Sequence, residues 1–227
     1  MNEKLKIGMF GGTFDPIHRG HIRAALEFYR ATDLSKMYVI PTGIPPHKKR
    51  IVTDSCHRLE MARLAFEECD KSIYNIEISD IETSKEGKSY TFLTVSELAK
   101  RNKCDRIYVY TGTDMFCCLE KWFNAQELFK LCVFCVCPRD KDEMSVILEC
   151  DQRYKKLYDA KSVVMNVPPL EMSSTEIRKL VEEQSSQCNG EADANKILNM
   201  LTKSYLTEKV AKYIIDNELY FRSTQEM

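Results

Sequence analysis

The sequence lacks the features that would place it outside ordinary globular proteins. Its apolar runs fall well short of the roughly 20 residues that span a bilayer, and the opening MNEKLKIGMF is too short and too charged for a secretory signal. Neither sign of charge dominates, because 33 basic residues are balanced by 34 acidic ones. That balance argues against a nucleic-acid partner and against a polybasic contact with a membrane. We therefore expect a cytoplasmic protein, with the nucleus not excluded.

Histidine is also scarce, with four residues, whereas the chain has ten cysteines. Three of them, Cys132, Cys135 and Cys137, lie in the apolar run LCVFCVCP, which is typical of a buried strand. Cys117 and Cys118 are adjacent within a predicted helix. A zinc site would need paired C-x2-C units or nearby histidines. We expect reduced, mostly buried thiols in preference to a disulfide framework or a zinc site.

Apolar runs alternate with amphipathic stretches along all 227 residues, a length that can bury a real core. Strands are predicted at Leu5–Phe10, Met37–Pro41, Ile73–Ile78, Arg106–Thr111, Leu131–Cys137 and Ser162–Val167. Helices are predicted at about 20–32, 54–69, 91–103, 124–129, 142–158, 174–183 and 206–217. This alternation predicts an α/β protein with a Rossmann-like, doubly wound parallel sheet of five to six strands, helices on both faces and a helical C-terminal end.

One stretch interrupts the pattern. EEQSSQCNGEADAN, residues 182–195, is polar and is predicted to be a mobile insertion between two helices. A helical part is expected to follow at about 196–220. With no internal repeat and no second boundary, residues 1–227 are expected to form a single domain. Its ligands should bind at the edge where the carboxyl ends of the parallel strands meet.

The first candidate site is GMFGGTFDPIHRGHIRAAL, which runs from Gly8 to Leu26 between the first strand and the first helix. Gly11 and Gly12 would let the backbone approach a ligand, and the free N–H groups of the first helical turn would donate to an anion. His18 and His21 would project from the same helix end. The stretch is neither a Walker loop nor G-x-G-x-x-G. We interpret it as a polyphosphate site, the plainer alternative being a glycine turn with two surface histidines.

Two further candidate stretches lie at the ends of predicted elements, one directly after a strand and one at the start of a helix. The loop PTGIPPHKKR, residues 41–50, carries cations that could neutralise polyphosphate or form a solvated basic turn. SYT, residues 89–91, opens a helix, where an N-cap is the plainer interpretation.

The last two candidate stretches lie in the second half of the chain. In YTGTDMFCCLEKW, Gly112 permits close approach and Asp114 could accept bonds from ribose hydroxyls, while Trp122 would fill the core in most proteins. In MSSTEIRKL, hydroxyls, free amides and Arg178 make a second anion site at a helix start. Ser173 and Glu176 of this stretch also fit the pattern of a helix capping box.

The first motif resembles the signature of the HxGH nucleotidyltransferase superfamily. In detail it is similar to the bacterial-type nicotinate/nicotinamide mononucleotide adenylyltransferases, and the likeness extends from Ile7 to Tyr220. The matching positions of the signature are Gly11, Gly12, Thr13, Phe14, Asp15, Pro16, His18, Gly20 and His21. Residues 112–122 fit the family's later G-x-D…W pattern, and MSSTEIR fits ISSTxIR with Met172 in place of Ile. Leu93 stands where that branch usually has Asp.

The resemblance implies adenylyl transfer from ATP to nicotinate mononucleotide, giving deamido-NAD and pyrophosphate, with nicotinamide mononucleotide as a second acceptor. It implies Mg²⁺ bound through the substrate phosphates, and His18, His21 and Arg178 as the catalytic residues. The expected ATP-binding residues are Gly11, Gly12, Thr13, Phe14, His18, Gly20, His21, Lys48, Gly112, Asp114, Ser174, Thr175 and Arg178. The expected mononucleotide-binding residues are Gly12, Thr13, Phe14, His47, Lys48, Tyr90, Thr91 and Trp122, with the indole of Trp122 stacked on the pyridine ring.

Two alternatives stay open at this point. A related transferase, acting on pantetheine phosphate or as a cytidylyltransferase, carries a similar first motif but neither of the later ones. A catalytically silent nucleotide sensor is disfavoured by the intact histidines and Arg178. The sequence leaves the oligomeric state open, and it is compatible with a homo-oligomer.

Overall fold

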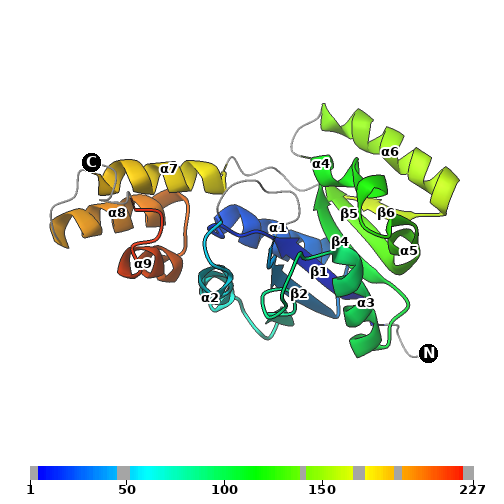
Figure 1. Ribbon diagram of the computed structural model, residues 1–227, viewed down its shortest axis with the longest axis horizontal. Coiled ribbons are helices and arrows are strands. Elements are labelled where there is room, and N and C mark those ends of the chain that lie inside the picture. Colours follow the sequence, from blue (N-terminus) through cyan, green and yellow to red (C-terminus); the bar gives the residue numbers. More distant parts are fainter. Residues whose placement is uncertain (1–4, 45–51, 139–141, 166–171, 187–190, 222–227) are drawn as a thin grey trace.

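A computed structural model describes residues 5–44, 52–138, 142–165, 172–186 and 191–221, and it contains a six-stranded parallel sheet (Figure 1). The strands are β1 Ile7–Gly12, β2 Lys36–Pro41, β3 Ile76–Ile78, β4 Ile107–Gly112, β5 Cys132–Cys137 and β6 Lys161–Val164. Their order is β3-β2-β1-β4-β5-β6. The chain builds from β1 to one edge and then returns, so that β4 pairs with the other side of β1. Open α/β sheets bind ligands at such a reversal.

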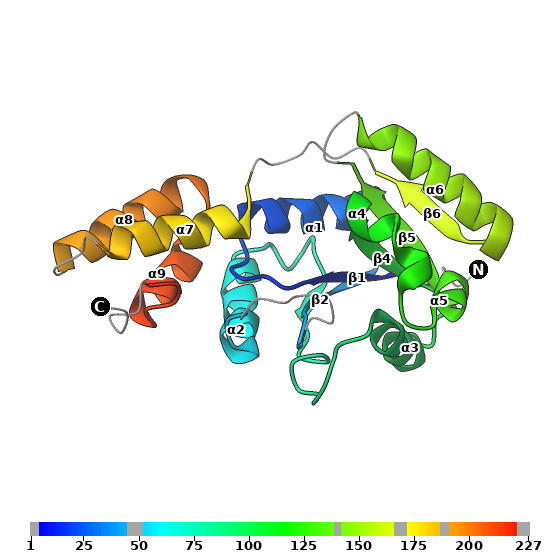
Figure 2. The same ribbon diagram turned by 45° about the horizontal axis from the view of Figure 1, so that its top comes forward.

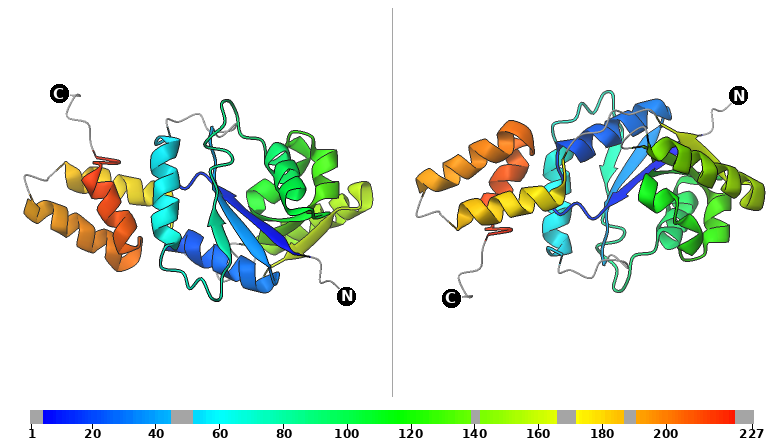
Figure 3. Two further views of the ribbon diagram at one scale, coloured as in Figure 1. Left: turned by 90° about the horizontal axis from the view of Figure 1, so that it is seen from below. Right: turned by 90° about the horizontal axis from the view of Figure 1, so that it is seen from above.

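Helices cover both faces of the sheet. They are α1 Arg19–Ala31, α2 Ser55–Phe66, α3 Thr91–Asn102, α4 Thr113–Phe116, α5 Ala125–Leu131, α6 Glu143–Tyr158, α7 Ser174–Ser185, α8 Glu191–Ser204 and α9 Glu208–Asp216, with a 3-10 turn at Leu119–Lys121. Helices α1, α2 and α7–α9 share one buried cluster with the sheet, and α3, α5 and α6 share the other. Figure 3 shows the two groups on opposite sides of the strands. The predicted doubly wound sheet is confirmed.

The cysteine-rich strand β5 lies inside the sheet between β4 and β6. Every residue from Cys132 to Cys137 is buried, as expected of a parallel strand covered on both faces. Burial raises the pKa of the Cys135 thiol to about 12. The nine cysteines in the described ranges are free thiols. Over the same ranges, no helix combines the length and apolarity needed to cross a bilayer.

Helices α7, α8 and α9 pack together next to α2 at one end of the molecule (Figures 1 and 2). They bury Ile177 and Val181 of α7, Leu201 of α8 and Ile214 of α9 in the cluster that also holds Met61 of α2. The C-terminal helices are therefore an integral part of the hydrophobic core, and they place the first turn of α7 next to the loop that follows β1.

The prediction of a mobile insertion at residues 182–195 was wrong for most of these residues. Residues 182–185 complete α7, and residues 191–195 begin α8. Glu and Gln are good helix formers, and the apolar anchors of the two helices, Val181 and Ile197, lie buried beside these polar runs. A polar composition alone does not distinguish helical turns from a loop.

Candidate active site

The buried ring of Phe14 packs beneath the loop between β1 and α1 and fixes its conformation. This residue has a left-handed backbone with φ 52°, and its buried ring stacks on Phe10 with centroids 5.9 Å apart. A Cβ on Gly12 would lie 2.5 Å from the Phe14 ring, so only glycine fits there. At Gly11 the nearest atom would be the flexible end of Met9, at 3.3 Å. The glycine at position 12 is thus explained by internal packing, and Phe14 can offer a ligand its backbone but not its ring.

His18 and His21 form a reciprocal pair at the start of α1. Their rings stack with centroids 3.7 Å apart and planes inclined by 28°. The backbone N–H of His21 donates to Nδ1 of His18 at 3.3 Å, and the N–H of His18 donates to Nδ1 of His21 at 3.2 Å. A ring nitrogen that accepts a hydrogen bond carries no proton, so each ring holds its proton on Nε2. The pair therefore presents two neutral N–H donors.

Burial reinforces this protonation state at His18. The side chain is almost fully enclosed, and burial lowers the pKa of His18 from 6.5 to about 4, outweighing a backbone hydrogen bond that raises it. The ring is therefore uncharged at neutral pH. It can donate to a phosphate oxygen without carrying a buried charge of its own.

The nest of free amides expected at this helix start is smaller than predicted. The N–H of Arg19 donates to the carbonyl of Tyr205 at 2.9 Å, and the N–H of His21 is engaged by His18. Gly20 lies between these two residues in the first turn of α1. Because two of the first-turn amides have acceptors within the protein, fewer backbone N–H groups are available to an anion than the sequence predicted.

Helix α7 brings Arg178 to the same loop. Ser174 Oγ donates to the carbonyl of Pro16 at 2.9 Å, and Arg178 Nη1 donates to the carbonyl of Asp15 at 2.5 Å. Nη2 of Arg178 also donates to Thr175 Oγ1 at 3.0 Å. Asp15 and Pro16 closely precede His18 in the chain, so the structure brings Arg178, Ser174 and Thr175 together with the histidine pair. The predicted capping box between Ser173 and Glu176 is also present.

The residues expected to bind the pyridine ring lie at the start of α3 and before α5. Tyr90 precedes α3 without capping it through its side chain, and Thr91 is the first helical residue. The Tyr90 ring lies 4.9 Å from that of Phe123. Trp122 is partly buried and packs against the second core cluster. The plainer interpretation of SYT as a Ser or Thr cap is wrong, because the N-cap of α3 is Tyr90. Ser89 Oγ instead accepts the N–H of Gly43 at 3.1 Å.

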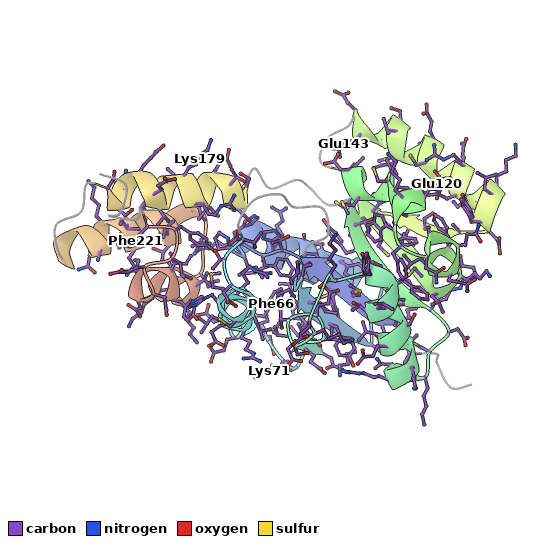
Figure 4. All side chains as sticks on the ribbon, in the orientation of Figure 1. Phe66, Lys71, Glu120, Glu143, Lys179 and Phe221 are labelled. Carbon is purple, nitrogen blue, oxygen red and sulfur yellow. The ribbon has the colours of Figure 1, made fainter. Side chains whose placement is uncertain are left out.

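The end of β4 contributes Gly112 and Asp114. Gly112 is the N-cap of the short helix α4, and Asp114 is exposed in its first turn. Thr113 Oγ1 donates to Glu143 Oε2 at 2.5 Å, which ties α4 to the start of α6, where Figure 4 labels Glu143. Because β4 and β1 are neighbours with parallel register, these residues share the carboxyl edge of the sheet with the glycines of β1.

Comparisons with known proteins agree with this arrangement. A family model described as cytidylyltransferase-like matches residues 9–180. A curated relative from Bacillus subtilis (strain 168), named nicotinate-nucleotide adenylyltransferase, is 34% identical over 216 residues and covers 95% of this chain and 98% of its own. This chain belongs to the nicotinate-nucleotide adenylyltransferase family. A probable member from Clostridium novyi (strain NT) is 32% identical over 212 residues, covering 93% of this chain and 96% of its own.

The fold has a close counterpart among solved members of the family. The Plasmodium falciparum nicotinic acid mononucleotide adenylyltransferase, solved in complex with NaAD, superposes with a TM-score of 0.72. Its sequence is 22% identical, and the match covers 95% of this chain and 97% of that one. The architecture expected from the sequence is thus confirmed.

Sequence reasoning missed three residues that support the adenylyltransferase site. Tyr220, near the end of the described chain, donates from its hydroxyl to Asp15 Oδ1 at 2.9 Å. Burial, together with the neighbouring carboxyl of Asp15, raises the pKa of the Tyr220 hydroxyl. Arg58 and Glu82 are charged residues that are nevertheless buried. The sequence around these three residues gives no local signal for their contacts, because helix α2 has no clear apolar face in which Arg58 would stand out. The expected phosphate contacts His47 and Lys48 lie outside the described residues.

Proposed function

We propose that this protein transfers the adenylyl group of ATP to nicotinate mononucleotide, forming deamido-NAD and releasing pyrophosphate. Membership of the family supports this reaction. The observation that carries it is the convergence of the His18–His21 pair and Arg178 on one loop, although they come from opposite ends of the chain. Three cationic or donor groups around one loop are suited to a polyphosphate.

The chemistry needs no nucleophilic side chain, because the 5′-phosphate of the mononucleotide is itself an anionic nucleophile. It attacks the α-phosphorus of ATP in line, a new P–O bond forms, and the bond to the pyrophosphate leaving group breaks. Orientation of two bound substrates can supply about 7–11 kcal/mol of the barrier, whereas general acid–base help supplies about 10²–10⁴-fold in rate. Positioning and charge stabilisation are therefore the main tasks of this site.

The proposed roles follow from the groups that each residue offers. The Nε2–H groups of His18 and His21 stabilise charge on the α-phosphate and the departing pyrophosphate. Arg178 holds the β- and γ-phosphates together with Lys48. Each charge-assisted hydrogen bond of this kind contributes about 1.5–3 kcal/mol. The loop residues Gly11, Gly12, Thr13, Phe14 and Gly20, and the α7 residues Ser174 and Thr175, line the path of the triphosphate.

The opposite end of the site accommodates the nucleosides. Gly112 and Asp114 approach the ribose of ATP, and the indole of Trp122 stacks on the pyridine ring, an arrangement that contributes about 0.5–1.5 kcal/mol beyond area burial. Backbone amides at Tyr90 and Thr91 face the ring's substituent. Amide donors suit a carboxylate, so the acid form of the mononucleotide is the preferred acceptor and the amide form the second.

Magnesium fits this site as a companion of the substrates. Within the described ranges there is no group of three His, Cys, Asp or Glu side chains that could enclose a metal ion. Mg²⁺ would accordingly be held mainly by phosphate oxygens, as this hard and strongly hydrated ion often is. It would neutralise phosphate charge there. The residues of the chain bind and orient the phosphates through His18, His21 and Arg178.

Turnover with defined substrates tests the proposal. Purified protein is incubated with ATP, Mg²⁺ and either nicotinate or nicotinamide mononucleotide, and the product is identified by mass. We expect deamido-NAD and pyrophosphate, with the higher kcat/KM for the acid. Parallel reactions contain pantetheine phosphate with ATP, and a phosphoalcohol with CTP. Product only in one of these reactions would identify a different transferase, and binding of ATP without pyrophosphate release would identify a sensor.

A further inference from the structure

The backbone at Thr42 and Gly43, just after β2, is held from one side by a buried guanidinium. Arg58 of α2 is 1% exposed. Its Nη1 donates to the carbonyls of Thr42 at 2.6 Å and Thr13 at 2.8 Å, and its Nη2 donates to the carbonyl of Gly43 at 2.8 Å. Its Nε donates to the carbonyl of Thr53 at 2.8 Å. One side chain thus joins the loop after β1, the loop after β2 and the start of α2.

The other side of the same peptide is held by a buried carboxyl. Glu82 is 7% exposed, and it lies in the segment between β3 and α3 that Figures 1 and 2 show between α2 and α3. Thr94 Oγ1 of α3 donates to Glu82 Oε1 at 2.8 Å. The hydroxyl of Ser89, which accepts the N–H of Gly43 at 3.1 Å, lies close to this carboxyl, whose pKa is raised by burial. Glu82 therefore lies between the Gly43 amide and the first turn of α3.

Gly43 packs directly against the backbone of Glu82 and the side chain of Ser89. A Cβ built at this position would lie 2.3 Å from the carbonyl oxygen of Glu82 and 2.9 Å from Ser89 Oγ. Ser89 adds a backbone bond of its own, from its N–H to the carbonyl of Ile44 at 3.1 Å. The loop after β2 and the start of α3 are consequently in direct backbone contact, and movement of either displaces the other.

Buried charges of this kind are costly unless they are fully hydrogen-bonded. Arg58 meets that condition through four backbone carbonyls of loops at the carboxyl edge of the sheet, whereas Glu82 accepts the hydroxyl of Thr94 and burial raises the pKa of its carboxyl. A guanidinium can bond several carbonyls at once because its donors are fixed in a plane. Hydrogen bonds are directional, whereas apolar packing is not. This arrangement can therefore fix the relative positions of the loops more tightly than apolar contacts could.

We propose that Arg58 and Glu82 are positioning residues that act through Gly43 to set the separation between the histidine loop and the start of α3. This inference rests on the proposed function, in which the histidine loop binds the ATP phosphates, where the 5′-phosphate of nicotinate mononucleotide attacks, and the start of α3 faces the carboxylate of the mononucleotide. Thr13, bonded by Arg58, belongs to the loop that carries His18. Ser89, close to the Glu82 carboxyl, immediately precedes Tyr90 and Thr91. The mononucleotide carries its phosphate at one end and its carboxylate at the other, so this separation selects a substrate of its length.

The decisive variant is Glu82→Gln, which preserves size but turns one acceptor into a donor facing other donors. We expect the KM for nicotinate mononucleotide to rise about tenfold or more, the factor expected for one lost hydrogen bond to a charged group. The KM for ATP and kcat should change less than about threefold, because the histidine loop is held by Arg58. The preference for the acid over the amide form should fall by a factor similar to the rise in KM.

Two further variants complete the design. Arg58→Lys keeps the charge but not the planar set of donors, so it should lower kcat as well as raise the KM for the mononucleotide. Glu97→Gln is the matched control, because Glu97 lies on α3 itself but pairs with Lys85 at 2.5 Å on the surface. Its kinetic constants should stay within about twofold of the wild type, as expected for an exposed pair.

Hydrogen exchange of the amides of residues 89–94 separates this inference from the proposed reaction. Faster exchange there in Glu82→Gln than in Glu97→Gln, together with the selective rise in KM, is the expected result. Unchanged exchange and unchanged KM would overturn the positioning role. If the wild type forms no dinucleotide, the proposed function fails and the link to substrate length fails with it, while the exchange comparison still decides whether Glu82 holds the start of α3.

Discussion

Replacing His18 with Asn should change how the stability of the protein depends on pH. In the folded state the pKa of His18 is lowered from 6.5 to about 4 by burial. Between these two values the unfolded chain binds a proton that the folded protein does not, so the free energy of unfolding rises with pH. The contribution is complete above pH 6.5 and is lost as the pH falls toward 4.

The size of the effect follows from the shift. One pKa unit corresponds to about 1.4 kcal/mol, so the window from 6.5 to 4 represents about 3 kcal/mol in total. At pH 5, about 2 kcal/mol of this has been lost. Asn is a good N-cap and can accept the N–H of His21 in place of the ring. The variant should therefore fold, and its loss of stability on acidification should be smaller than that of the wild type.

Urea unfolding of both proteins at pH 7.5 and pH 5.0, at one ionic strength, measures the effect. The contributions of all other titrating groups cancel when the variant is subtracted from the wild type at each pH. We expect this difference to shift by about 2 kcal/mol in favour of the variant at the lower pH. A difference that stays constant within about 0.5 kcal/mol would show that His18 is not held neutral by burial, and the assignment of a neutral donor would fall with it.

Three other perturbations test neighbouring parts of the structure. His21→Ala should lower kcat/KM by about 10²-fold or more while the circular dichroism spectrum is unchanged, since a donor to the developing charge is lost; near-normal turnover would remove the pair from the chemistry. Tyr220→Phe should destabilise the fold by about 1–3 kcal/mol, because the buried carboxyl of Asp15 loses a donor. Tyr213→Phe is the control in the same urea-unfolding experiment. The hydroxyl of Tyr213 contacts His57 Nδ1 at 2.9 Å in a more exposed setting, so its removal should lower the free energy of unfolding by less. A thiol reagent should label exposed Cys56 rapidly but Cys132 and Cys135 only on unfolding, because both are buried and burial raises the pKa of each thiol; rapid labelling of either would contradict the placement of β5.

The sheet was predictable because parallel strands buried on both faces are nearly continuous apolar runs. All six predicted strands are present. The boundaries that differ most are the start of β3, at Ile76 and not at Ile73, and the end of β6, at Val164 and not at Val167. Ile73 is 59% exposed in the turn before the strand, so an apolar residue there extended the pattern without joining the sheet. The first residues of helix α8 were predicted to belong to an insertion because they are polar, although they are helical.

Contiguous motifs predicted which residues meet at the loop after β1, whereas contacts made across long stretches of the chain were not predictable. The histidines and Arg178 belong to motifs whose spacing is specific. Arg58 and Tyr220 have no local signature, since the carbonyl of Thr13 lies 45 positions from Arg58 and the carboxyl of Asp15 lies 205 positions from Tyr220. Contacts of that kind are created by the topology of the sheet and helices, which a local reading of the sequence does not contain.

The bond between Tyr220 and Asp15 has a consequence for biosynthesis. A ribosome releases the β1 loop from its exit tunnel long before it has polymerised the residue that completes the loop's hydrogen bonding. The sheet can form on the growing chain, but the histidine loop stays incomplete until the last helices have emerged. Premature termination after Arg178 but before position 220 would yield a product that has all of the sequence motifs but lacks the hydroxyl that bonds Asp15.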